Sequence, residues 1–110
     1  MIFLEASADL AAVTTTVSSA QEARSLTQAV LGQRLAACVQ VEAVVSHYRW
    51  EGALQEAGEH RLVFKALPEA VPALLGALRA LHPYDLPELV VQPLRATAEY
   101  AGWVRQEAAA

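Results

Sequence analysis

CVQVEAVVSHYRW, residues 38–50, runs without a glycine or a proline and is rich in valine. Valine and aromatic residues favour extended backbone, so this stretch predicts one long β-strand. At about 3.3 Å per residue such a strand extends about 43 Å, whereas a compact chain of this length has a diameter of roughly 34 Å. The strand and its hairpin partner should therefore project beyond their own domain, unless a β-bulge or a bend divides the strand in two.

A projecting hairpin exposes unpaired backbone groups and apolar side chains. A bare strand edge invites association with other chains, and further copies of the same chain would cover it. The length of this strand therefore predicts a symmetric homo-oligomer.

The segment before this strand contains a strand pattern and a helix pattern. Residues 11–17 are rich in β-branched side chains and predict a strand. Ser19 and Glu22 stand in the positions of a capping box and predict a helix that begins after Ser19. Residues 1–10 fit a short strand, a loose arm or a piece of helix, and we treat them as a possible flexible N-terminal arm.

The segment after this strand contains the remaining elements. They are a turn at 51–52, a returning strand at 60–66, a helix that begins near 68–72 and ends at 81, a strand at 87–94, and a last helix. Pro93 should end the fourth strand, and Thr97 can cap the last helix. The order is the β-α-β-β-α-β pattern of the ferredoxin-like split sandwich, an α+β fold with two helices on one face of an antiparallel sheet.

Composition limits the classes of partner. The 110 residues fit one domain, with 55% apolar and 18% charged residues. The net charge is −4 and no basic cluster occurs, so we expect no nucleic-acid partner. No apolar run approaches the roughly 18 residues of a membrane helix, and the apolar start is too short for a signal peptide. A single cysteine excludes an internal disulfide, and we expect a cytoplasmic protein.

The segment HPYDLPE, residues 82–88, joins the second helix to the last strand. Its two prolines bias His82 and Leu86 away from helical dihedral angles, so the segment predicts a rigid, extended corner. The corner either presents polar side chains to a ligand or only ends a helix and starts a strand.

An ordered set of residues from about 13 to 105 carries a family resemblance. It consists of the hexapeptide RLAACV at 34–39, Ser46, Tyr48, Trp50, Gly52, Lys65, the corner residues His82, Pro83, Tyr84, Pro87 and Glu88, then Pro93, Tyr100 and Trp103. In this order and spacing the chain resembles the CutA family of divalent-cation tolerance proteins. The resemblance implies a ferredoxin-like homotrimer with long strands pairing between subunits, and binding of metal ions, copper in particular. The trimer also resembles PII signalling proteins, which leaves an interaction or signalling scaffold as the alternative.

The candidate metal ligands are His82, Cys38, Glu88 and Asp85. Imidazole and thiolate suit copper and zinc. No CxxC, HxxxH or HExxH spacing occurs, so a site for copper or another divalent cation would be assembled in space, near or across a subunit boundary. The alternatives are that His82 caps its helix and that Cys38 is an ordinary buried thiol.

Lys65, Tyr84 and Glu59 are the candidates for a ligand cleft. Lys65 is the only lysine and lies in an apolar strand, so on a buried face it would need a carboxylate partner such as Glu59 or Glu88. The alternative is a solvent-facing position on a half-exposed strand.

Tyr48 and Trp50 share one face of the long strand, and together with Trp103 they are our candidates for subunit contacts, because amphipathic rings favour interfaces. We expect no catalysis, since nothing in the sequence orients a Cys38–His82 nucleophile pair.

Overall fold

The helices and strands follow the order that the sequence predicts. The computed structural model describes residues 5–108. The elements are β1 (Ala8–Val17), α1 (Ala20–Gly32), β2 (Cys38–Trp50), β3 (Ala53–Ala66), the short 3₁₀ helix η1 (Pro68–Ala70), α2 (Val71–Leu81), β4 (Val90–Ala96) and α3 (Ala98–Ala108). The ferredoxin-like order and the extra C-terminal helix are confirmed.

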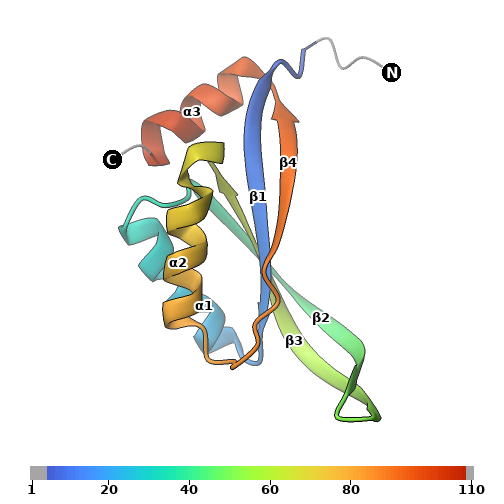
Figure 1. Cartoon of the computed structure of the whole chain (residues 1–110). Helices are drawn as coiled ribbons and strands as arrows, with labels where there is room; N and C mark the ends of the chain where they lie inside the picture. The colour runs from blue at the N-terminus through green and yellow to red at the C-terminus, as the bar shows by residue number, and fades with distance from the viewer. Residues whose placement is uncertain (1–4, 109–110) are drawn as a thin grey trace.

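The four strands form one antiparallel sheet in the order β2-β3-β1-β4. β2 pairs with β3 from Cys38↔Lys65 to Trp50↔Ala53, but the pairing of β1 with β3 stops at Val17↔His60. Residues 44–59 therefore extend past the end of β1 as a two-stranded ribbon, which we call the projecting hairpin (Figure 1). The radius of gyration is 15.0 Å, against about 13 Å for a compact chain of this length.

The turn of the projecting hairpin lies where the sequence predicts it. Glu51 and Gly52 have positive φ angles of 50° and 79°. Two consecutive residues with positive φ make the type I′ turn, whose twist matches that of paired strands. The backbone geometry at the tip therefore supports an unbroken hairpin.

Two apolar clusters lie on opposite faces of the sheet. α1 and α2 lie side by side (Figure 1) and pack on a face that includes the fully buried Val13, Leu62 and Phe64. α3 packs across the end of the sheet at which β1 begins, around Leu10 and other buried residues. Because Leu10 and Val13 are three residues apart on one strand, their side chains leave it on opposite faces. α3 therefore covers one end of the second face.

Several predicted boundaries were wrong. β3 begins at Ala53, not at residue 60, and β4 runs from Val90 to Ala96 with Pro93 inside it, paired with Ala11. β4 is an edge strand, where a residue without an N–H group is tolerated. β1 begins at Ala8, so the end of the expected arm is part of the sheet, while residues 1–4 lie outside the described residues.

The predicted helix caps are confirmed. The Glu22 N–H donates to Ser19 Oγ at 3.1 Å, and the Tyr100 N–H donates to Thr97 Oγ1 at 3.3 Å. Among residues 5–108, no helix combines the length and the apolar character needed to cross a bilayer.

Candidate functional site

His82 turns its ring away from solvent and toward β1. Its backbone N–H donates to Leu78 O at 2.9 Å and ends α2, and its extended backbone (φ −69°, ψ 136°) is the one that a following proline favours. The residue is only 9% exposed. Its Nε2 atom lies 2.9 Å from both Thr15 Oγ1 and the Thr16 carbonyl oxygen. On the other side of the ring, Nδ1 accepts the Tyr84 N–H at 3.1 Å.

These partners determine which ring nitrogen of His82 carries the proton. A backbone N–H can only donate, so Nδ1 presents a lone pair to Tyr84. The Thr16 carbonyl can only accept, so Nε2 carries the hydrogen. Burial lowers the pKa of His82 below 6.5, although the Thr16 bond and the charges of Glu22 and Glu59 oppose this shift. The ring is therefore neutral, and in this conformation neither nitrogen offers a free lone pair to a metal ion.

Tyr84 continues the connection from His82 to the base of the projecting hairpin. The two rings meet edge to face with centroids 4.9 Å apart, and Tyr84 Oη donates to Glu59 Oε2 at 2.8 Å. Burial and the Glu59 carboxylate both raise the pKa of Tyr84, so the phenol remains a donor. Glu59 pairs with Val44 where the hairpin leaves the sheet. The corner thus ties β1 to the start of the projecting hairpin.

The structure does not gather the four candidate metal ligands within one chain. Cys38 lies opposite Lys65, and Thr15, which the His82 ring contacts, lies opposite Leu62. Lys65 and Leu62 are three residues apart on β3, so Cys38 and His82 lie on opposite faces of the sheet. Both corner carboxylates, Asp85 and Glu88, are exposed. Within residues 5–108, no group of three or more His, Cys, Asp or Glu side chains could hold a metal ion.

Lys65 and Glu59 do not form the expected pair. Lys65 donates to Gln40 Oε1 at 3.1 Å, while Glu59 accepts from Tyr84. Six residues of extended strand separate Lys65 from Glu59, about 20 Å. The solvent-facing alternative fits Lys65, whose hydrogen bond is exposed.

The second face of the sheet holds a polar group that the sequence only partly revealed. Cys38, Gln40 and Lys65 project there together, and Tyr100 of α3 lies close to Cys38. Burial makes the largest contribution to the raised pKa of Tyr100, and the neighbouring Cys38 raises it further. Gln40 could have been found from strand periodicity, because it is two residues from Cys38. The proximity of Tyr100 has no such local signal.

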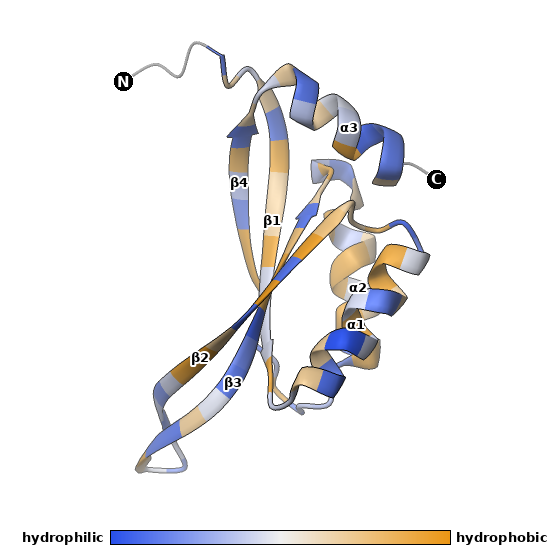
Figure 2. Cartoon of the chain, turned by 180° about the vertical axis from the view of Figure 1, so that it is seen from behind, coloured by the Kyte–Doolittle hydropathy of each residue, from blue (hydrophilic) through white to orange (hydrophobic). Residues whose placement is uncertain are grey.

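The projecting hairpin carries large side chains that the described chain covers only in part. Figure 2 shows its apolar stretches well away from the helices. Tyr48 is 44% exposed, Trp50 50% and Leu54 78%. Trp103 on α3 is 43% exposed and its ring contacts that of Tyr100 at a centroid distance of 5.7 Å. All three aromatic interface candidates are thus available for contacts outside the chain.

Comparison with known proteins identifies relatives along most of the chain. The family described as "CutA1 divalent ion tolerance protein" matches residues 11–107. The divalent-cation tolerance protein CutA of Thermus thermophilus is 41% identical over 93 residues, which cover 83% of this chain and 90% of that protein. Protein CutA of Homo sapiens is 36% identical over 86 residues, and the match covers 76% of this chain but only 48% of the human protein.

Solved structures show the same similarity. The structure of CutA from Synechococcus elongatus superposes with a TM-score of 0.89 at 39% identity, over 94% of this chain and 93% of that one. A protein from Archaeoglobus fulgidus, named a periplasmic divalent cation tolerance protein CutA, superposes with a TM-score of 0.87 at 26% identity, over 90% of this chain and 98% of that one. None of these four proteins is named as an enzyme.

Proposed function

The chain belongs to the CutA1 divalent ion tolerance protein family, and from this premise we propose that it is a homotrimeric binding or regulatory protein that acts in tolerance of divalent cations without catalysis. The observation that supports the homotrimer is the projecting hairpin, whose Trp50 and Leu54 present exposed apolar surface that another chain would cover. In a symmetric homo-oligomer, further copies of the same chain supply this covering surface. The role in tolerance of divalent cations is supported by the named relatives.

The proposed cation site lies between subunits. Three ligands do not converge within the described part of one chain, which supports a site for copper or another divalent ion that combines side chains of different copies. Cys38 is the preferred ligand because a thiolate binds copper and zinc strongly. The exposed carboxylates of Asp85 and Glu88 are free to approach a neighbouring subunit. His82 holds the corner that carries both carboxylates.

One observation favours a scaffold as the second candidate function. Both ring nitrogens of His82 are used within the chain, as expected of a rigid brace. In that case the trimer presents a surface to another protein and copper has no specific role. We retain the cytoplasm as the proposed location and one domain as the proposed unit, and cell fractionation and limited proteolysis test these two points.

Native mass spectrometry, with and without Cu(II) and Zn(II), separates the two candidates. The cation proposal expects a trimer that takes up a fixed number of ions, with uptake lost in Cys38→Ser and kept in His47→Ala, whose histidine lies on the exposed hairpin. A trimer with only graded uptake in all variants favours the scaffold. A monomer at micromolar concentration would contradict both. Trp50→Lys should dissociate the trimer, because it places a charge in the proposed contact.

A further inference from the structure

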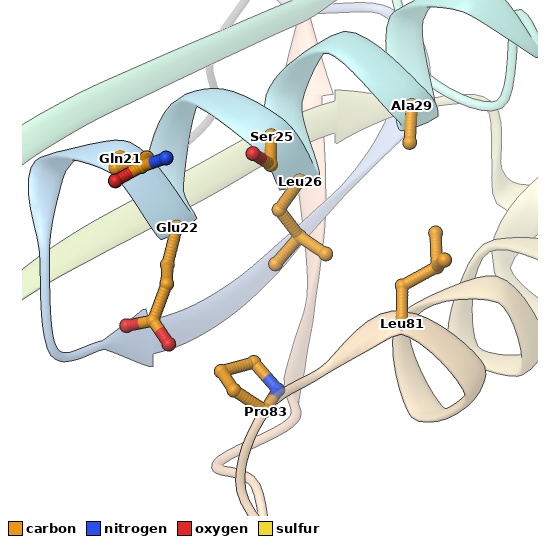
Figure 3. A pocket seen from close by; sticks show the side chains of 7 residues that line it. All are labelled: Gln21, Glu22, Ser25, Leu26, Ala29, Leu81 and Pro83. Atoms are coloured by element: carbon orange, nitrogen blue, oxygen red, sulfur yellow. The ribbon is translucent and has the colours of Figure 1, made fainter.

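A cleft of about 260 Å³ lies between α1 and the corner that follows α2 (Figure 3). Leu26 and Ala29 of α1 face Leu81 and Pro83 across it and give it an apolar floor. Leu81 is 47% exposed although it is a large apolar residue. Gln21, Glu22 and Ser25 complete the lining, so among the described residues the cleft wall includes no lysine or arginine.

Glu22 brings a fixed negative charge to one end of this cleft. Its Oε1 atom accepts hydrogen bonds from the Ser18 N–H at 3.2 Å, from the Ser18 hydroxyl, and from the Ser19 hydroxyl at 3.2 Å. All three bonds use Oε1, so Oε2 stays available to a ligand as far as the described residues are concerned. The Ser18 hydroxyl bond lowers the pKa of Glu22, so the carboxylate is ionised at neutral pH. Figure 3 shows this carboxylate at the Pro83 end of the cleft.

The opposite wall is the end of α2, whose last turn also carries the basic side chain of Arg79. α2 ends at Leu81, and the C-terminal end of a helix carries a partial negative charge from its carbonyl groups. Pro83 has no N–H group, so it places no backbone donor in the cleft. The polar end of the cleft holds the Glu22 carboxylate with the Gln21 and Ser25 side chains, which can donate and accept, and the rest of its lining is apolar.

We infer that this cleft binds a small organic ammonium ion, with its charged group at Glu22 Oε2 and its hydrocarbon part against Leu26 and Leu81. A bare metal ion would leave the apolar floor unused, and an anion would meet the Glu22 charge. Pockets for drug-sized ligands have volumes of about 300–1,000 Å³, so this cleft suits a smaller molecule. The site is complete in one chain, and the inference does not depend on the trimer or on the proposed cation site.

The test is a ¹H–¹⁵N NMR titration of the full chain with n-butylammonium chloride. We expect saturable shifts of the Leu26, Ala29 and Leu81 amides in the millimolar range. Glu22→Gln keeps the size of the side chain and an acceptor for the Ser18 and Ser19 donors, and should weaken binding about tenfold. Ala29→Met fills the apolar part of the cleft from α1, leaves the Glu22 bonds intact, and should abolish the shifts. Glu69→Gln, which removes a carboxylate in η1 before α2 begins, should bind like the parent.

Two controls can overturn the inference. If n-butanol produces the same shifts at the same concentrations, the cleft is only an apolar surface and the ammonium class is wrong. If MgCl₂ or ZnCl₂ shifts the same amides and competes with n-butylammonium, the site binds bare cations instead. Unchanged binding by Ala29→Met would place the ligand elsewhere. Because none of these readouts depends on assembly, they are distinguishable from failure of the proposed function.

Discussion

Replacement of His82 by phenylalanine tests the brace between the corner and β1. Phenylalanine keeps a ring of similar size, so the packing changes little, but it removes every hydrogen bond of the imidazole. The Thr15 hydroxyl, in a fully buried residue, and the carbonyl of Thr16, which is 7% exposed, both lose the ring as a partner. Each buried polar group left unpaired costs about 1–3 kcal/mol. For these two groups together we expect the free energy of unfolding to fall by about 2–6 kcal/mol, since the more exposed Tyr84 N–H can turn to water.

The assay is urea denaturation at pH 7.5, with parent and variant at the same chain concentration and at two concentrations, because assembly makes stability concentration-dependent. The matched control is His47→Phe on the projecting hairpin. His47 is exposed and lies 3.7 Å from Glu56, and loss of such a contact should change the free energy of unfolding by less than about 0.5 kcal/mol. If His82→Phe changes stability no more than His47→Phe, with equal m-values, the ring does not hold the corner and the reasoning fails.

Three further predictions follow from the same contacts. Burial lowers the pKa of folded His82 below 6.5, so on acidification the unfolded chain takes up the proton before the folded chain does. As the pH decreases from 6.5, the free energy of unfolding should therefore decrease by at most about 1.4 kcal/mol per pH unit. His82→Gln should flatten this fall in urea denaturation from pH 7.5 to 5, and parallel curves would rule the linkage out. Ser19→Ala removes the N-cap of α1 and should cost about 0.5–2 kcal/mol in thermal unfolding, with Ser19→Asp largely restoring it; equal losses in both variants would contradict the cap. Tyr84→Phe removes the bond to Glu59 and should cost about 1 kcal/mol, with faster hydrogen exchange at the base of the projecting hairpin; exchange that rises only at the corner would show that the two are not coupled.

Strands whose own residues favour an extended backbone were predictable from the sequence. Strands that are extended because a neighbouring strand supplies their hydrogen bonds were not. β2 matches the predicted range at both ends, because its valines and aromatic residues favour extended backbone wherever they lie. The first half of β3, by contrast, contains Ala53, Gly58 and polar residues that have little strand preference of their own. It is extended because β2 supplies its hydrogen bonds. Pro93 misled the prediction of β4 because its effect depends on whether the strand is at an edge, which sequence order does not reveal.

The extended backbone of His82 was predictable, but the contacts of the corner were not. Two prolines indicate an extended backbone, yet the orientation of the His82 ring depends on Thr15 and Thr16, which are more than sixty residues earlier in the chain. Its selection as a candidate metal ligand rested on its residue type and on the family resemblance, neither of which carries information on how the ring is oriented. The separation of Cys38 from His82 likewise depends on strand register, which determines the face on which each side chain lies.

The pairing of β1 with β4 has a consequence for synthesis on the ribosome. β1 emerges first, but one of its two neighbours is the last strand of the chain, with Ala8 paired to Ala96. The β2–β3 hairpin is local in sequence, and hairpins form within microseconds, whereas pairing between distant segments is slow. On a polysome, the hairpin of each nascent chain is therefore formed and displayed before that chain can close its sheet.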